Sequence, residues 1–239
     1  RIRGTVQLTK TDREYPDNKL TGAEFTVYRD SNGNKELDAD DERLGTLTET
    51  GIGVYEMADL LYGGYFVKET KAPEGFYLDG NAYYFEITED GKTATVENEA
   101  GKGFVNAPQV GSLKIIKTSS DGKVEGFSFR VTGPNGYVGV FTTDKNGEIT
   151  IDDLRIGEYV VSEVSDGASS AYVLPADKTA SVYEGAVTKV EMHNELRDTP
   201  KTGDDSNPAL WFALLGVSAA GAAVLDIVGF RKRRKEDAE

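Results

Sequence analysis

The chain has 239 residues, of which 27 are Lys or Arg and 41 are Asp or Glu, so its formal net charge at pH 7 is −14. A field of that sign argues against nucleic acid and anionic lipid as partners. The absence of cysteine excludes disulfides, thiolate metal sites and cysteine nucleophiles, and the single histidine leaves little room for histidine-dependent hydrolysis. With no phosphate loop or cofactor motif either, we expect a structural or binding protein that is not an enzyme and requires no cofactor.

Residues 1–198 read as short segments that alternate apolar and polar residues between Gly, Asp and Asn turns. Such segments, repeated at intervals of about 8–12 residues, predict an all-β fold of Ig-like β-sandwiches. The opening segment at Arg1 is already strand-like, which we interpret as the start of a fragment or mature segment of an exported protein. In chain order, the segments include TVQLTK at 5–10, EFTVYRD at 24–30, GYFVKET at 64–70, YYFEITEDGKTATVE at 83–97, SLKIIKT at 112–118, FSFRVTG at 127–133, GEITIDDL at 147–154 and EYVVSEV at 158–164.

An internal repeat divides this part of the chain in two. We therefore predict one domain over 1–108 and a second, divergent domain over 109–197, each of a size typical of one sandwich. The matching pairs are GTVQLTKTD at 4–12 with GSLKIIKTS at 111–119, MADLLYGGYFVKET at 57–70 with TIDDLRIGEYVVSEV at 150–164, and VNAPQ at 105–109 with HNELR at 193–197.

Three polar residues of each repeat fall on an otherwise apolar strand face, because alternate side chains of a strand share a face. In the first repeat, Lys10 follows Val6 and Leu8, Glu69 follows Tyr65 and Val67, and Asn106 follows Phe104; the second repeat has Lys117, Glu163 and Asn194 at the matching positions. A single residue of this kind is explained by a side chain that reaches back to solvent. Six at matched positions indicate a shared buried site, since a buried charge or amide costs several kcal/mol unless it is paired.

Both repeats resemble the SpaA-type domains of Gram-positive pilins and the B-type domains of collagen adhesins. The motifs are KTD at 10–12, LTGAEFTVY at 20–28, YFVKETKAPEGF at 65–76 and GFVNAP at 103–108. The resemblance implies a prealbumin-like β-sandwich. It also implies a spontaneous isopeptide bond between Lys10 and Asn106, promoted by Glu69. The second repeat has KTS and no TxAPxG, but it keeps Lys117, Glu163 and Asn194, so we expect a second bond there.

Burial explains how such a bond could form. Desolvation lowers the pKa of a lysine and raises that of a glutamate, so a buried pair can relax to a neutral amine and a neutral acid. The amine attacks the asparagine carboxamide while the acid stabilises the developing charge and moves protons to the departing ammonia. The reaction occurs once per molecule and is self-modification. By the chain-entropy model for disulfides, closing a loop of about 100 residues is worth about 4–5 kcal/mol.

An acidic segment, DSNGNKELDADDE at 30–42, has the spacing of a calcium loop. Asp30, Asn32 and Asn34 lie at alternate positions and Asp41 at the twelfth, and hard oxygen ligands suit Ca²⁺. However, Lys35 occupies the usual glycine position and no glutamate stands at position twelve. A calcium site and a solvated hairpin turn therefore both remain open.

The last region, 198–239, carries three elements in order. TPKTG at 199–203 is followed by an apolar run at 208–230 and by RKRRK at 231–235. As one transmembrane helix the run would span about 34 Å, and the basic cluster marks its cytoplasmic end. The layout resembles the LPxTG-type cell-wall sorting signal, with Thr199, Pro200, Lys201, Thr202 and Gly203 at the motif positions. Thr199 stands where leucine is usual, which leaves the class of sortase open.

That resemblance implies cleavage by a sortase between Thr202 and Gly203 and transfer of the Thr202 carbonyl to a peptidoglycan precursor or another pilin subunit. The membrane contact is then transient, and the mature protein is anchored in the cell wall at the cell surface. Three functions remain open: a pilin subunit or stalk, an adhesin domain that binds a host or matrix ligand, and an uncleaved single-pass membrane protein.

Overall fold

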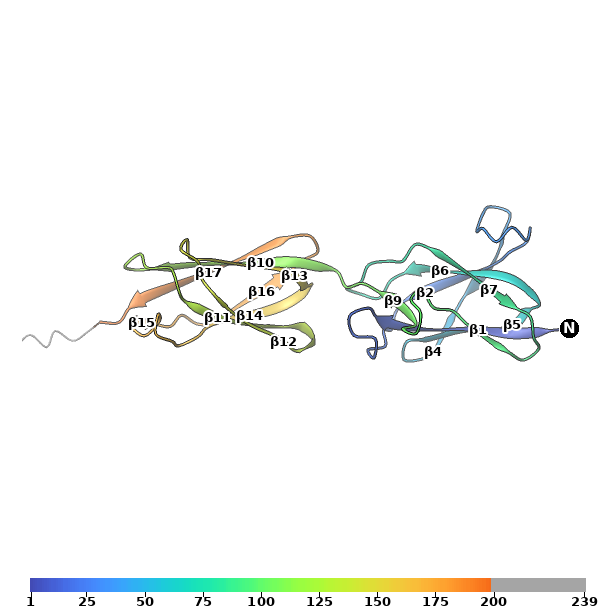
Figure 1. The fold of residues 1–239 in the computed structure, drawn as a ribbon, viewed down its shortest axis with the longest axis horizontal. Coiled ribbons are helices and arrows are strands. Elements are labelled where there is room, and N and C mark those ends of the chain that lie inside the picture. The colour runs from blue at the N-terminus through green and yellow to red at the C-terminus, as the bar shows by residue number, and fades with distance from the viewer. Residues whose placement is uncertain (199–239) are drawn as a thin grey trace, which may run out of the picture. The chain divides into compact units, whose positions relative to one another are not determined.

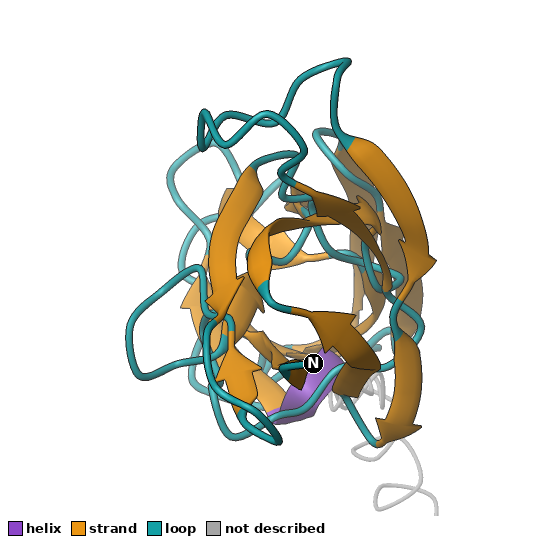
Figure 2. Ribbon diagram, turned by 90° about the vertical axis from the view of Figure 1, so that its right-hand side faces the viewer, coloured by secondary structure: helices purple, strands orange, loops and turns teal. Residues whose placement is uncertain are grey.

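The computed structural model describes residues 1–198. Within them strands and loops form nearly all of the chain, and the helical structure is one 3₁₀ turn at Pro134–Gly136, so the all-β prediction is confirmed there (Figure 2). No helix in residues 1–198 is long and apolar enough to cross a membrane. The predicted sortase motif at 199–203, the apolar run at 208–230 and the basic cluster at 231–235 lie outside the described residues.

The first sandwich consists of two sheets (Figure 1). One has the strand order β4-β5-β1-β8, with β9 also paired to β1, and the other has the order β3-β2-β6-β7. The strands are β1 Arg3–Asp12, β2 Glu24–Arg29, β3 Glu42–Thr46, β4 Thr48–Gly51, β5 Val54–Leu61, β6 Gly63–Lys71, β7 Ala82–Ile87, β8 Thr93–Thr95 and β9 Phe104–Asn106.

The second sandwich repeats this plan with sheets of order β13-β10-β17-β15 and β12-β11-β14-β16. In both, the first strand pairs antiparallel with one neighbour and parallel with the last strand. The strands are β10 Val110–Ser119, β11 Ser128–Gly133, β12 Tyr137–Thr142, β13 Glu148–Arg155, β14 Gly157–Glu163, β15 Tyr172–Val173, β16 Lys178–Val182 and β17 Val187–Leu196.

The parallel pairing sets the register between the lysine and the asparagine of each domain. Lys10 lies opposite Phe104, two residues before Asn106. Lys117 lies opposite Met192, again two residues before its asparagine. Since side chains two residues apart share a face, lysine and asparagine point into the same core in both domains.

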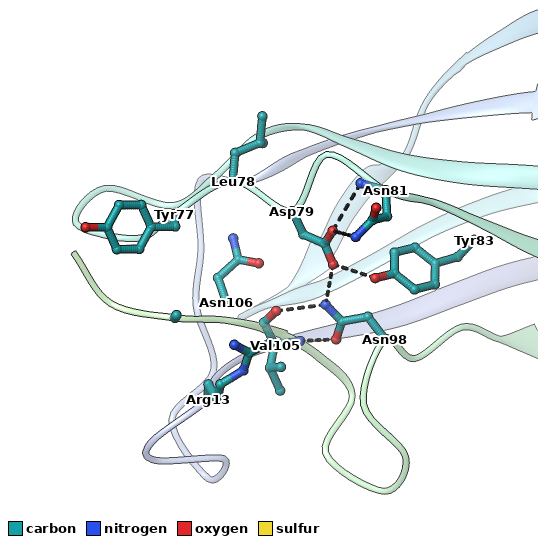
Figure 3. Close-up of a pocket in the computed structure, with 10 residues that line it drawn as sticks. Arg13, Tyr77, Leu78, Asp79, Asn81, Tyr83, Asn98, Val105 and Asn106 are labelled. Carbon is teal, nitrogen blue, oxygen red and sulfur yellow. Dashed lines mark hydrogen bonds between the residues drawn. The ribbon is translucent and has the colours of Figure 1, made fainter.

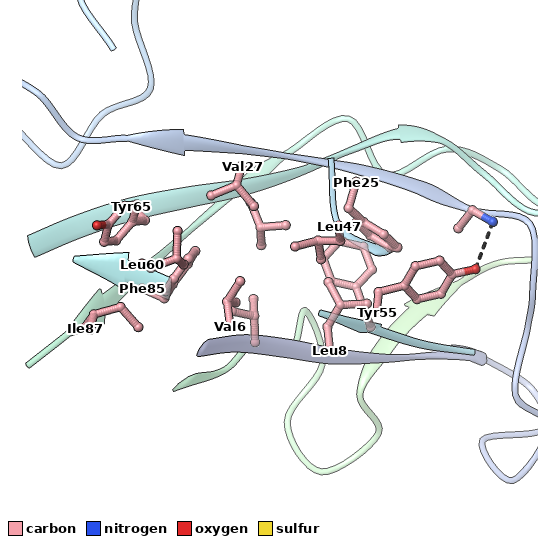
Figure 4. Close-up of a cluster of buried hydrophobic side chains, with 14 residues drawn as sticks. Val6, Leu8, Phe25, Val27, Leu47, Tyr55, Leu60, Tyr65, Phe85 and Ile87 are labelled. Carbon is pink, nitrogen blue, oxygen red and sulfur yellow. Dashed lines mark hydrogen bonds between the residues drawn. The ribbon is translucent and has the colours of Figure 1, made fainter. Parts of the chain in front are cut away.

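Each core fills the space between its two sheets. In the first sandwich, alternate residues of β1 and β2 bury Val6, Leu8, Phe25 and Val27, as Figure 4 shows. The ring of Phe25 packs edge-to-face on that of Phe104, with ring centroids 4.9 Å apart. Such aromatic pairs add about 0.5–1.5 kcal/mol beyond their buried area. They also fix β9, and with it Asn106, against the core.

The loop after β6 is held beside β9 by backbone hydrogen bonds. Tyr77 N–H donates to the carbonyl of Ala107 at 2.9 Å, and Gln109 N–H donates to the carbonyl of Gly75 at 2.8 Å. The proline of the APEG sequence, Pro73, accepts from Phe76 N–H and so closes the turn. The loop that follows Glu69 is therefore positioned against the strand that carries Asn106.

Candidate functional site

The first sandwich brings its three predicted residues together inside the core. Lys10 and Glu69 are 0% exposed and Asn106 is 2% exposed. Lys10 Nζ lies 3.7 Å from Glu69 Oε1 and donates to the Phe104 carbonyl at 2.9 Å. Asn106 Nδ2 donates to both carboxyl oxygens of Glu69 at 2.9 Å. Amine, carboxyl and carboxamide thus form one buried cluster across β1, β6 and β9.

Burial shifts the two ionisable groups of this cluster in opposite directions. It lowers the pKa of Lys10 to about 8, against the attraction of Glu69 and Asp79. It raises the pKa of Glu69, against the hydrogen bonds from Asp79 N–H and Asn106 and the attraction of Lys10. These shifts bring the pKa of Lys10 and the pKa of Glu69 closer together. Transfer of a proton from Lys10 to Glu69 therefore costs less free energy than it would in water.

One atom of the cluster has no partner. Asn106 Oδ1 is buried and accepts no hydrogen bond from any residue of 1–198. A buried acceptor left unpaired costs about 1–3 kcal/mol. If the Asn106 carboxamide rotated by about 180°, its Oδ1 would face Glu69. Only a protonated Glu69 carboxyl could then donate a hydrogen bond to this oxygen. The orphaned oxygen therefore favours the neutral acid that the predicted chemistry needs.

The second sandwich also buries its three residues but connects them differently. Asn194 Nδ2 donates to Glu163 Oε1 at 2.6 Å. Lys117 Nζ donates instead to the carbonyl of Thr118 and lies 4.3 Å from the centre of the Phe127 ring. Over the described part of the chain, no ion pair within 4.0 Å joins Lys117 to Glu163. Burial again lowers the pKa of Lys117 and raises that of Glu163.

Two buried atoms of this second cluster lack hydrogen-bond partners within residues 1–198, namely Glu163 Oε2 and Asn194 Oδ1. In the first cluster the equivalent carboxyl oxygen, Glu69 Oε2, accepts from the backbone N–H of Asp79 at 2.8 Å. The second cluster therefore has the same three residue types, but no backbone N–H donates to its glutamate as that of Asp79 does to Glu69.

The sequence pattern missed three residues that surround the first cluster: Asp79, Tyr83 and Asn98. The Asp79 carboxylate accepts from Tyr83 Oη at 2.6 Å and from Asn98 Nδ2 at 2.8 Å, as Figure 3 shows. Asp79 belongs to an LDGN segment that reads as an ordinary turn. A signal was available in the second repeat, whose corresponding segment, LPAD at 174–177, does not keep the Asp-Gly sequence.

The predicted calcium residues lie in an exposed loop whose oxygens are engaged in local turns. Asp30 accepts from Gly33 N–H at 2.8 Å and Asp41 from Ser31 N–H at 3.0 Å. The amide nitrogens of Asn32 and Asn34 both donate to Asp38. Residues 1–198 contain no group of three or more His, Asp or Glu side chains placed to hold a metal ion. The calcium site remains a prediction.

Comparison with known families identifies both sandwiches. The model of the SpaA prealbumin-like fold domain matches residues 4–102 and again 111–196. Colossin-A of Dictyostelium discoideum is 28% identical over an alignment of 173 residues that covers 65% of this chain and 1% of Colossin-A. The chain thus spans a very small part of that relative.

Two solved structures resemble this chain, and the first of them shares its fold. The Bacillus anthracis TIE protein superposes with a TM-score of 0.61 at 24% identity, covering 81% of this chain and 34% of that one. A C-terminal fragment of the pilus adhesin SpaC from Lactobacillus rhamnosus GG is 15% identical, with a TM-score of 0.46, and covers 82% of this chain and 98% of the fragment.

Proposed function

Because the chain belongs to the family of SpaA prealbumin-like fold domains, we propose that it is a structural stalk of a cell-surface protein, as a pilin subunit or adhesin shaft. Each of its sandwiches is closed by an intramolecular Lys–Asn isopeptide bond. The observation that carries this proposal is the buried cluster of Lys10, Glu69 and Asn106, repeated as Lys117, Glu163 and Asn194. The role is mechanical, and the chemistry occurs once in each domain.

The proposed reaction balances as follows. Lys10 gives one proton to Glu69, and its neutral Nζ then bonds to Cγ of Asn106 while the protonated Glu69 donates to the carboxamide oxygen. A second proton moves from Nζ to Nδ2, the Cγ–Nδ2 bond breaks, and ammonia leaves. Lysine and asparagine become one amide, and Glu69 retains the first proton or passes it to the ammonia.

The location of the bond supports a load-bearing role. It would join the first strand, β1, to the last strand of the same sandwich, β9, which lie parallel as neighbours. Tension along the chain would pass from Lys10 directly to Asn106 and bypass nearly all of the domain between them. The sandwich would then resist force without having to unzip its sheets.

The proposal extends to the anchor, since a stalk must be attached. A sortase cleaves between Thr202 and Gly203 and joins the Thr202 carbonyl to an amine of a peptidoglycan precursor or another subunit. The supporting feature is the order of TPKTG, apolar run and basic cluster in the sequence. The protein would then reside in the cell wall after a transient membrane stage.

The anchoring step is tested by digesting cell walls of a bacterium that carries sortase and expresses the whole chain. The expected material ends at Thr202 and carries a wall fragment or a lysine of another subunit, and Thr202→Ala should abolish it. A ladder of SDS-resistant polymers would identify a pilin, and release as one size a single anchored protein. Retention in the membrane with residues 204–239 attached would contradict the anchoring step.

The role of the glutamates is tested by Glu69→Gln and Glu163→Gln in the whole chain. Each change should slow bond formation in its own domain by about 10²–10⁴-fold, the usual worth of general acid–base catalysis, and leave the other domain unaffected. Peptide mapping at fixed times after synthesis measures both bonds in one sample. Glu86→Gln, an exposed change on β7, serves as the control. Unchanged rates in both variants would remove the glutamates from the mechanism.

A further inference from the structure

A polar network beside the first cluster reaches both of its reacting partners. Asp79 contacts Glu69 through its backbone, because its N–H donates to Glu69 Oε2 at 2.8 Å. The side chain of Asp79 fixes that N–H in place: its carboxylate accepts from Asn81 N–H at 3.1 Å, from Tyr83 Oη at 2.6 Å and from Asn98 Nδ2 at 2.8 Å.

Asn98 extends the network to the strand that carries the electrophile. Its Nδ2 also donates to the carbonyl of Val105 at 2.9 Å, and its Oδ1 accepts from Val105 N–H at 2.7 Å. Val105 directly precedes Asn106 on β9. Asp79 and Asn98, joined by the hydrogen bond that Figure 3 shows, therefore hold Glu69 from one side and the strand of Asn106 from the other.

We propose that Asp79 and Asn98 are positioning residues for formation of the Lys10–Asn106 bond, and that they select which oxygen of Glu69 carries the transferred proton. This inference rests on the proposed isopeptide function. Glu69 Oε2 accepts the Asp79 N–H and so acts as the carbonyl oxygen of the neutral acid. The proton then resides on Oε1, the oxygen 3.7 Å from Lys10 Nζ, while Asn106 Nδ2 lies 2.9 Å from both carboxyl oxygens and does not distinguish them. The acid hydrogen then lies on the oxygen nearer the amine, and rotation of the Asn106 carboxamide brings Oδ1 round to accept it.

The same residues provide a route to solvent. Asp79, Tyr83, Asn98 and Asn106 line a pocket of about 260 Å³. Ammonia released from Asn106 can leave through this pocket without disturbing the apolar core. Departure of the ammonia makes the bond irreversible in practice.

The second sandwich serves as a natural comparison because it lacks the network. Asp166, in the loop after Glu163, directs its backbone N–H to Ser169 Oγ at 2.9 Å. Glu163 Oε2 has no hydrogen-bond partner within residues 1–198. No backbone donor thus determines which oxygen of Glu163 would carry the proton.

The test follows both cross-links in the whole chain after cell-free synthesis, with samples quenched in acidic denaturant and mapped by mass spectrometry. Asp79→Ala and Asn98→Ala should slow the Lys10–Asn106 bond by about tenfold or more, because misplacement of reacting groups is costly. Asp79→Asn keeps one acceptor oxygen for the loop and should stay within about threefold of the parent. The Lys117–Asn194 bond in the same molecules should form at its usual rate.

Two controls separate positioning from mere folding. Asp144→Ala removes a carboxylate that also holds its own turn, through Asn146 and Glu148 N–H, but contacts no cluster residue. Each variant is also combined with Asn106→Ala, which prevents the bond, and its melting temperature is measured. A rate loss with an unchanged melting temperature in that background, rescued by Asp79→Asn, supports the inference.

Rates equal to the parent in both alanine variants would overturn the inference and leave the isopeptide proposal standing. A rate loss that follows the melting temperature and is not rescued by Asp79→Asn would also overturn it, since it would reveal a structural role alone. If the parent chain itself forms no Lys10–Asn106 bond, the proposed function fails first and the inference with it.

Discussion

The two sandwiches carry the same three residues at matching strand positions, yet the surroundings of those residues differ. In the first, Lys10 lies within ion-pair distance of Glu69, and both oxygens of Glu69 accept hydrogen bonds. In the second, Lys117 turns to a backbone carbonyl, and Glu163 keeps one buried oxygen unpaired within residues 1–198. Strand register brings the reacting residues together, whereas loops determine how they are oriented.

The last strand is the source of much of this difference. In the second sandwich it is one continuous strand, β17, along β10. In the first it is divided into β8 and β9, and the intervening segment at 96–103 carries Asn98. The division interrupts the regular pairing and supplies the side chain that connects Asp79 to β9. The sandwich whose last strand is divided is thus also the one whose glutamate accepts more hydrogen bonds.

The largest expected effect is the loss of stability when either bond is prevented. Asn106→Ala should lower the free energy of unfolding of the first sandwich by about 4–5 kcal/mol, because the loop closed by the bond then opens in the unfolded chain. Asn194→Ala should cost the second sandwich nearly as much, about 4–5 kcal/mol, since the energy depends only weakly on loop length. Denaturant unfolding of the whole chain measures both.

Asn18→Ala is the matched control for these variants, because it changes an exposed asparagine of the first sandwich that lies outside the cluster and its hydrogen-bond network. Surface changes of this kind usually stay within about 0.5 kcal/mol. A loss of only about 1 kcal/mol in Asn106→Ala, the worth of a hydrogen bond, would indicate that no covalent loop had been removed.

The next effect compares the rates of the two bonds in one molecule. Because only the first cluster has a Lys–Glu pair within 4.0 Å and a backbone donor to the glutamate, the Lys10–Asn106 bond should form about tenfold faster or more than Lys117–Asn194. The time course of both cross-linked peptides after synthesis provides the ratio. If the two bonds formed at equal rates, or if the second formed faster, these contacts would not determine the rate of bond formation.

The smallest effect is the pH dependence of the first bond. The reactive pair holds one proton, shared between Lys10 and Glu69. At low pH both groups are protonated and the amine cannot attack; above about pH 8, where Lys10 loses its proton, Glu69 has none to donate. The rate should therefore be bell-shaped with an upper limb near pH 8. In Glu69→Gln the residual rate should instead rise with pH and level off, and an upper limb kept in that variant would contradict the assignment.

The sequence was sufficient to predict the all-β architecture and the inward orientation of the six cluster residues. Both depend on a period of two, which a strand imposes on any sequence that buries one face. Lys10 after Val6 and Leu8 has no other face to occupy once those two are buried. Because Lys117 occupies the same position in the second repeat, the inward lysine could be recognised as a shared feature of both domains.

The orientation of the cluster could not be predicted in the same way. Asp79 and Asn98 lie in irregular segments, where contacts depend on the path of the loop and follow no period. Lys117 points into the core by the same strand alternation as Lys10. Its long side chain can nevertheless reach several buried acceptors, and it donates to the carbonyl of Thr118. A strand pattern determines the face a residue points to, and the neighbouring loops determine its partner.

The most direct test of the account is the mass of the folded chain and of its cross-linked peptides. Each bond should lower the mass by about 17 Da, the mass of one ammonia, with Lys10 joined to Asn106 in one peptide and Lys117 to Asn194 in another. Folded protein of unshifted mass, with all four residues recovered in separate linear peptides, would contradict it.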